Sequence, residues 1–86
     1  MTTVQANPVE IAATIVAARD RVLAGREGMC IDLKVAVFLQ SMYPHGIHYR
    51  DVAVILGIDI GSISAAFSAL KAVRMIENID GVGTWL

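Results

Sequence analysis

The sequence predicts a mainly α-helical domain of four helices that closes with a small β-hairpin. Four segments repeat apolar residues at the 3.6-residue period of an amphipathic helix, and glycine, proline or a capping residue marks their limits. The last segment surrounds Asp80-Gly81, a strong signal for a two-residue hairpin turn. A length of 86 residues allows one small domain. We expect residues 7–86 to form that domain and residues 1–6 to be a flexible arm.

The first helix is expected over residues 7–24. Asn7 can cap its start, Pro8 suits the first helical position, and Gly25 and Gly28 are breakers near its end. Apolar residues on this helix form two neighbouring stripes, which is more than one small core needs. The first stripe holds Ile11, Ile15, Ala18 and Val22, and the second holds Val9, Ala12, Val16 and Leu23.

One stripe of this helix is expected to face the domain and the other to face a partner. We assign the contact of a homodimer to the first stripe and the arginine beside it, namely Ile11, Ile15, Ala18, Arg19 and Val22. Two interpretations of Arg19 stay open. Its stem packs while its charged head reaches water, or it forms an ion pair across the subunit interface.

The second helix is predicted to be central to the core. Asp32 is its expected cap and residues 33–42 are its body. Most of this body is apolar, through Ala36, Val37, Phe38, Leu39 and Met42. Pro44 and Gly46 then stop the helix, and Ile47 can form a very short strand.

A short third helix is predicted over residues 49–56. Gly57 follows it and ends it, because glycine readily adopts the left-handed conformation found after helices. The positions that face the core are Val52, Ala53 and Leu56.

The fourth helix begins at the cap Asp59 and extends to about Val73. Its inward stripe, at helical spacing, consists of Ile63, Ala66, Phe67, Leu70 and Val73. The hairpin after it turns at Asp80-Gly81, and this turn fixes which residues face each other across the strands. The expected pairs are Ile79 with Val82, Glu77 with Thr84, and Ile76 with Trp85.

The second half of the chain contains a series of short motifs. They are Asp51-Val52-Ala53, Leu56-Gly57-Ile58, Gly61-Ser62-Ile63-Ser64, Leu70 and Met75-Ile76. Together with the order of the expected elements, they resemble the winged helix-turn-helix domain of transcriptional regulators of the broad MarR- and ArsR-like kind. The resemblance covers about residues 32–86, and it implies four helices with a C-terminal wing.

The resemblance also implies that the fourth helix enters the major groove of double-stranded DNA. The residues that it places toward DNA are Arg50, Ile60, Gly61, Ser62, Ser64, Ala65, Ser68, Lys71 and Arg74. Bases are discriminated best by arginine, lysine, asparagine or glutamine, and none of these precedes Lys71 in this helix. We therefore expect a small DNA-binding transcriptional regulator, a homodimer, with weak base readout.

The chain departs from the pattern of these regulators at three places. His48 stands where a threonine or serine cap is common, and Arg74 stands where a glycine often ends the helix. The expected wing, residues 77–85, carries two acids and no cation. The formal net charge is −1, whereas nucleic-acid binders more often carry a basic surplus.

A protein-interaction module on the same frame is the alternative. Hydrophobic residues make up 56% of the chain and charged residues 17%, whereas ordinary globular chains hold about 45–50% and about 25%. An exposed apolar patch is therefore expected. The fourth helix also has a strip of small residues that suits close approach by another helix or a nucleic-acid backbone, formed by Gly61, Ala65, Ser68 and Ala72. Such a chain would serve as an adaptor, an assembly subunit or an inhibitor of the kind that mobile elements encode.

The sequence does not predict an enzyme, a cofactor or a metal site. It has no phosphate loop, nucleophile elbow or zinc-ligand spacing. His45 and His48 lie three residues apart but lack a neighbouring cysteine or carboxylate, so loop and cap roles are favoured. Cys30 has no flanking cation, and we expect a buried or half-buried thiol, with a redox sensor as the alternative.

The chain is expected to be soluble and cytoplasmic, without a membrane partner. Its apolar stretch from Val9 to Leu23 is interrupted by charged residues, whereas a membrane span needs about 20 mainly apolar ones. The N-terminus lacks the layout of a signal peptide. A single cysteine excludes an internal disulfide, which fits a reducing compartment.

Overall fold

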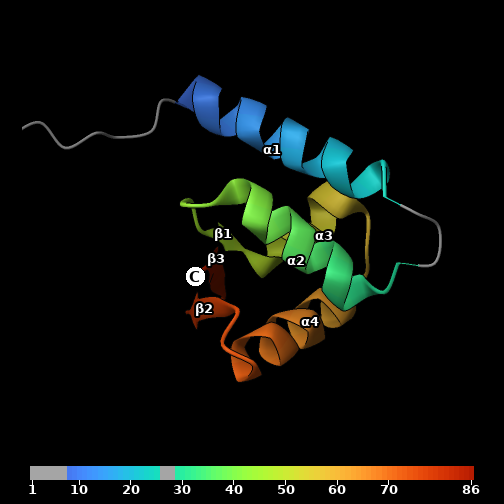
Figure 1. Cartoon of the computed structure of the whole chain (residues 1–86), viewed down its shortest axis with the longest axis vertical. Coiled ribbons are helices and arrows are strands. Elements are labelled where there is room, and N and C mark those ends of the chain that lie inside the picture. Colours follow the sequence, from blue (N-terminus) through green and yellow to red (C-terminus); the bar gives the residue numbers. More distant parts are fainter. Residues whose placement is uncertain (1–7, 26–28) are drawn as a thin grey trace, which may run out of the picture.

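Helices make up most of the chain, and a small sheet closes it (Figure 1). The computed structural model describes residues 8–25 and 29–86, so the expected arm, the expected cap Asn7 and the breaker Gly28 lie outside the described residues. The elements in chain order are α1 (Pro8–Leu23), α2 (Ile31–Met42), β1 (Ile47–His48), α3 (Tyr49–Leu56), α4 (Ile60–Ala72), β2 (Ile76–Ile79) and β3 (Val82–Trp85). The strands form an antiparallel sheet in the order β1-β3-β2. The predicted class, mainly helical with a small β-hairpin, is confirmed.

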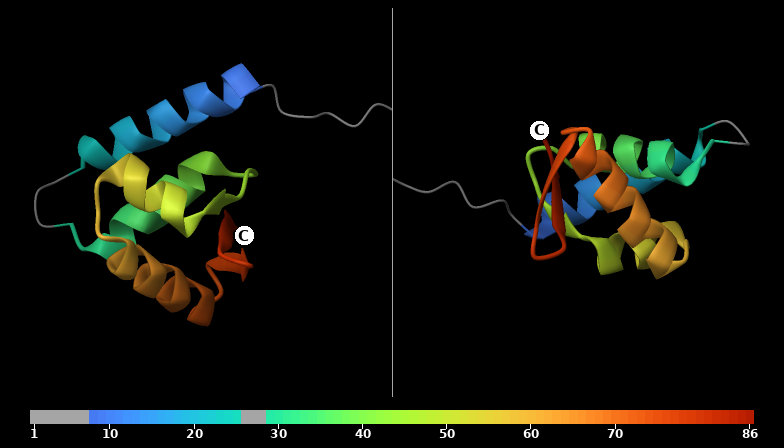
Figure 2. Two further views of the ribbon diagram at one scale, coloured as in Figure 1. Left: turned by 180° about the vertical axis from the view of Figure 1, so that it is seen from behind. Right: turned by 90° about the horizontal axis from the view of Figure 1, so that it is seen from below.

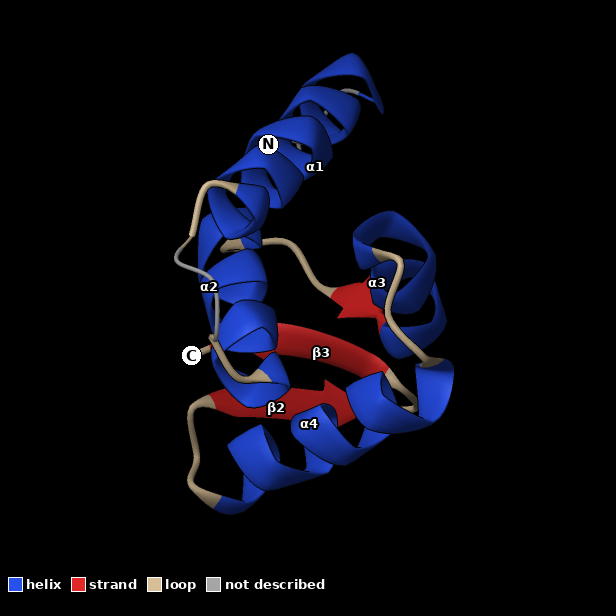
Figure 3. Ribbon diagram, turned by 90° about the vertical axis from the view of Figure 1, so that its right-hand side faces the viewer, coloured by secondary structure: helices blue, strands red, loops and turns tan. Residues whose placement is uncertain are grey.

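The helices are arranged around α2. α1 and α4 lie on opposite sides of the molecule with α2 between them (Figure 2), and the hairpin runs beside α4 (Figure 3). As predicted, α2 and α4 supply most of the core. The buried apolar residues are Ala18, Val22, Val35, Ala36, Phe38, Leu39, Met42, Ile47, Val52, Ala53, Ile63, Ala66, Phe67, Leu70 and Ile76.

Local signals fix the ends of α3 and α4. The backbone N–H of Arg50 donates to Nδ1 of His48 at 3.1 Å, so the histidine caps α3 where a hydroxyl is more usual. Gly57 ends α3 in the left-handed conformation, with φ of 65°. The backbone N–H of Ser62 donates to Oδ2 of Asp59 at 3.1 Å and caps α4. Gly57 and the Asp59 cap therefore define the sharp turn between the two helices, and His48 fixes the start of α3.

Two expected helix limits are wrong. α2 begins at Ile31 with Cys30 at the cap position, and Asp32 lies in the first turn, where its negative charge still complements the helix dipole. Val73 does not belong to the inward stripe of α4. The helix ends at Ala72, and the chain then turns through Arg74 at φ of 62°, which leaves Val73 64% exposed.

The α1 stripe expected to contact a second subunit packs against the chain's own core. Ala18 is 0% exposed and Val22 is 5% exposed, while Ile11 and Ile15 are half-buried. The expected dimer contact is therefore wrong for Ala18 and Val22, because α1 uses this face to pack along α2. The exposed Arg19 lies beside this face, with Nη2 3.4 Å from Oδ1 of Asp20.

The hairpin has the predicted register, with Ile79 opposite Val82 and Ile76 opposite Trp85. Asp80 and Gly81 both adopt positive φ, of 52° and 86°. This conformation is the one that a two-residue type I′ turn requires.

Replacing Gly83 with alanine should destabilise the domain, because β3 packs directly on an aromatic ring of α4. A Cβ at Gly83 would lie 2.5 Å from Cε2 of Phe67, whose side chain is 1% exposed and has no room to withdraw. Overpacking of this kind destabilises by about 1–3 kcal/mol. Urea denaturation followed by circular dichroism measures the effect, and an unchanged midpoint would show that the ring does not press on the hairpin.

Candidate nucleic-acid interface

The outward face of α4 is exposed along the whole helix. Between Ile60, which is 46% exposed, and Lys71, every exposed side chain is small, namely Gly61, Ser64, Ala65, Ser68 and Ala69. Ser62 is half-buried, and its hydroxyl lies 3.5 Å from Oδ2 of Asp59, so it is partly engaged by the cap. The structure thus brings the expected α4 residues together on one flat face, which lets another molecule approach the helix backbone closely.

The three cations that are expected to contact DNA lie at opposite ends of the hairpin. Arg50 is beside the hairpin turn, because the backbone N–H of the adjacent Tyr49 donates to the carbonyl of Gly81 at 2.9 Å. Lys71 and Arg74 lie at the other end, where they line a groove of about 410 Å³ with Ile76, Glu77, Asn78, Ile79 and Leu86. The three cations therefore do not form one continuous positive band.

Acidic residues outnumber these cations in the second half of the chain. From α3 to the C-terminus the chain carries three cations, Arg50, Lys71 and Arg74, and four acids, Asp51, Asp59, Glu77 and Asp80. All seven side chains are exposed. Long-range attraction to a polyanion such as DNA is consequently small, so binding of one would depend on short-range contacts.

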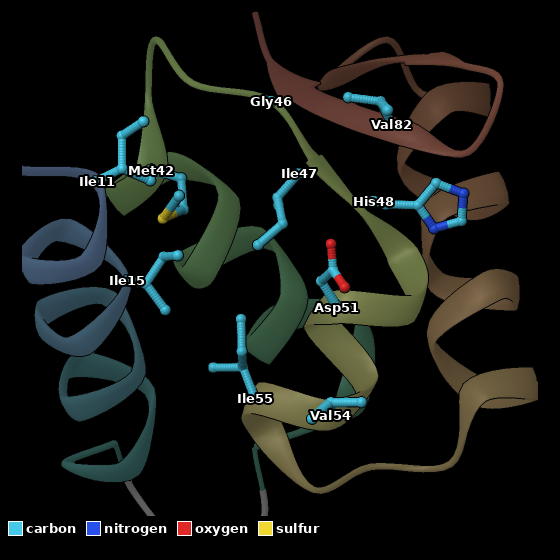
Figure 4. Close-up of a pocket in the computed structure, with 10 residues that line it drawn as sticks. All are labelled: Ile11, Ile15, Met42, Gly46, Ile47, His48, Asp51, Val54, Ile55 and Val82. Atoms are coloured by element: carbon cyan, nitrogen blue, oxygen red, sulfur yellow. The ribbon is translucent and has the colours of Figure 1, made fainter. Parts of the chain in front are cut away.

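A second concave surface lies between α1, β1 and α3 (Figure 4). This groove of about 540 Å³ is lined by Ile11, Ile15, Met42, Gly46, Ile47, His48, Asp51, Val54, Ile55 and Val82. The sequence did not indicate it, because it forms only when α1 and α3 come together across α2. The local feature that could have indicated the groove is Val54, an apolar residue at an outward position of α3 that is 82% exposed.

Histidine and cysteine side chains show no metal centre in the part of the chain that the structure describes. No group of three or more histidine, cysteine or acidic residues comes close enough there to hold an ion. His48 uses Nδ1 as a cap and stacks on Tyr49, with ring centroids 4.6 Å apart. The expectation of a buried or half-buried Cys30 is wrong, because the residue is exposed at the start of α2.

None of the helices over residues 8–25 and 29–86 is both long enough and apolar enough to cross a bilayer. Comparison of the chain with protein families, curated proteins and solved structures gave no match.

Proposed function

We propose that this chain is a winged helix-turn-helix module that binds double-stranded DNA through α4, with weak base readout. The observation that carries the proposal is the exposed face of α4, which presents serine hydroxyls and small side chains on a helix held at a fixed turn to α3. A helix presented in this way fits the major groove. The hairpin beside α4 supplies the wing.

The contacts follow from the chemistry of the exposed side chains. Ser64 and Ser68 donate hydrogen bonds to phosphates or make single contacts to base edges. Arg50 and Lys71 pair with phosphates on either side of the groove. No side chain between Ile60 and Ala69 can form the bidentate contacts that separate one base pair from another, so the proposed module tolerates many sequences.

Binding should depend shallowly on salt. Three cations per copy neutralise about three phosphates, which gives a slope of about −3 in a plot of log K against log salt concentration. Fluorescence anisotropy with duplexes of mixed sequence at low salt measures both the affinity and this slope. Absence of binding at about tens of micromolar protein would overturn the proposal.

A protein-interaction module is the second candidate, and the balance of charge favours it. From α3 to the C-terminus the acids outnumber the cations by four to three, a balance that weakens attraction to DNA but not van der Waals contact with a protein. The exposed strip of Gly61, Ala65, Ser68 and Ala72 would then meet a helix of that partner. A pull-down with the native chain, Ala65→Arg and Ala65→Glu separates the two candidates.

A further inference from the structure

α1 carries a second apolar stripe, which points away from the core. Its residues Val9, Val16 and Leu23 are 73%, 48% and 66% exposed, and Ala12 and Ala13 between them are also exposed. The helix lies on the outside of the molecule above α2 (Figure 1). Three large apolar side chains therefore line the outer side of a helix whose inner side is already packed.

The spacing of this stripe fits a second helix lying alongside. Val9, Val16 and Leu23 are separated by seven residues each, which is the repeat that keeps one seam in contact along two supercoiled helices. Alanine between the large residues lets the two backbones approach closely.

Charged residues flank the stripe on its two sides. At 3.6 residues per turn, Arg19 lies roughly 60° to one side of Val16 and Asp20 roughly 40° to the other. Within one chain they form an exposed ion pair at 3.4 Å. A two-fold axis along a parallel pair would place Arg19 of each copy beside Asp20 of the other. An antiparallel pair centred on Val16 would place these charges beside alanines instead.

We propose that a second copy of this chain covers the stripe, in a parallel α1–α1 homodimer with Val9, Val16 and Leu23 at its seam. A second copy fits the stripe, because the seven-residue repeat matches itself and each flanking charge meets its opposite. The exchanged ion pairs add specificity and little stability, since both side chains stay exposed to water. With a single 16-residue helix per copy, the contact is small and the dimer is weak.

This arrangement has a consequence that rests on the proposed function. A two-fold axis parallel to α1 places the two bodies on opposite sides of the helix pair. Because α4 lies on the side of each body away from α1, the two α4 faces point away from each other. Each duplex then contacts one copy of the chain. The slope of log K against log salt concentration stays at about −3, as for the monomer. Dimerisation itself is measured without DNA, so the failure of one proposal is distinguishable from the failure of the other.

Sedimentation velocity from about 10 μM to about 1 mM tests the dimer, a range chosen for a small contact. The chain should shift from monomer to dimer with concentration, and Val16→Asp should stay monomeric with unchanged circular dichroism. Val54→Asp is the matched control, because Val54 lies on α3 and is more exposed than Val16. The Val54→Asp variant should dimerise like the native chain. A chain that stays monomeric throughout, or a Val16→Asp variant that dimerises as before, would overturn the proposal.

Disulfide trapping tests the direction of the pair in a Cys30→Ser background. Cysteine introduced singly at residue 9, 16 or 23 should cross-link to the same residue of the second copy in each case. An antiparallel pair would cross-link through residue 16 alone and would contradict the parallel arrangement. Failure of all three variants to cross-link would show that the seam is not the contact.

Discussion

Ala65→Arg should tighten DNA binding by about tenfold, because it adds a cation at the centre of the exposed α4 face. One charge-assisted hydrogen bond to a phosphate contributes about 1.5 kcal/mol, which corresponds to about tenfold in the dissociation constant. Ala65→Glu should weaken binding by a similar factor through repulsion. Ala65 is exposed, so neither change should alter the fold, and anisotropy at fixed salt measures the effect.

The same pair of variants separates the two candidate functions. A protein partner that lies flat on the small-residue strip of α4 would be displaced by either side chain, because both are long. Loss of partner capture in a pull-down with both variants, with DNA affinity absent or unchanged, would favour the interaction module. Opposite effects of arginine and glutamate on DNA affinity would favour the DNA-binding module.

Phe67→Ala should destabilise the domain by about 3–5 kcal/mol, the largest stability effect that we expect from one substitution. Phe67 is 1% exposed, packs against β3 at Gly83, and makes an edge contact with Tyr49 at 6.3 Å between ring centroids. Its removal leaves a cavity where α3, α4 and the hairpin meet. A chain of this length has a total stability of roughly 4–13 kcal/mol, so the loss is a large share of it and the urea midpoint of the variant should fall sharply.

Val73→Ala provides the control for this substitution. Val73 is 64% exposed after the end of α4, and exposed substitutions usually change stability by less than about 0.5 kcal/mol. Urea titration of both variants gives the comparison. Equal losses of stability in Phe67→Ala and Val73→Ala would mean that the core is not centred on Phe67.

The features that the sequence predicted correctly depend on short-range chemistry. Gly57 and Asp59 mark the turn between α3 and α4 through their own conformation and hydrogen bonds. Asp80-Gly81 sets the hairpin register because the positive φ values that the turn needs restrict its residues. Such signals lie within a few residues of their effect and require no knowledge of the packed molecule.

The features that the sequence did not predict depend on packing between distant segments. Both stripes of α1 are apolar, and only contact with α2 decides that Ala18 and Val22 are buried. Cys30 is exposed at the start of α2, a position that the local sequence did not indicate. The groove between α1 and α3 has residues from separate elements and therefore no local pattern. The placement of the α4 residues on one exposed face could be predicted, because a helical period alone determines it.

The most direct measurement of the central claim is a titration of the ¹⁵N-labelled chain with a short duplex, followed by amide chemical shifts. DNA binding through α4 predicts that the largest shifts fall on Ser64, Ala65 and Ser68, with smaller ones at Arg50 and in the hairpin, and none on the outer stripe of α1. No shifts at millimolar DNA, or shifts confined to α1 and the groove beside it, would contradict the proposed DNA-binding surface.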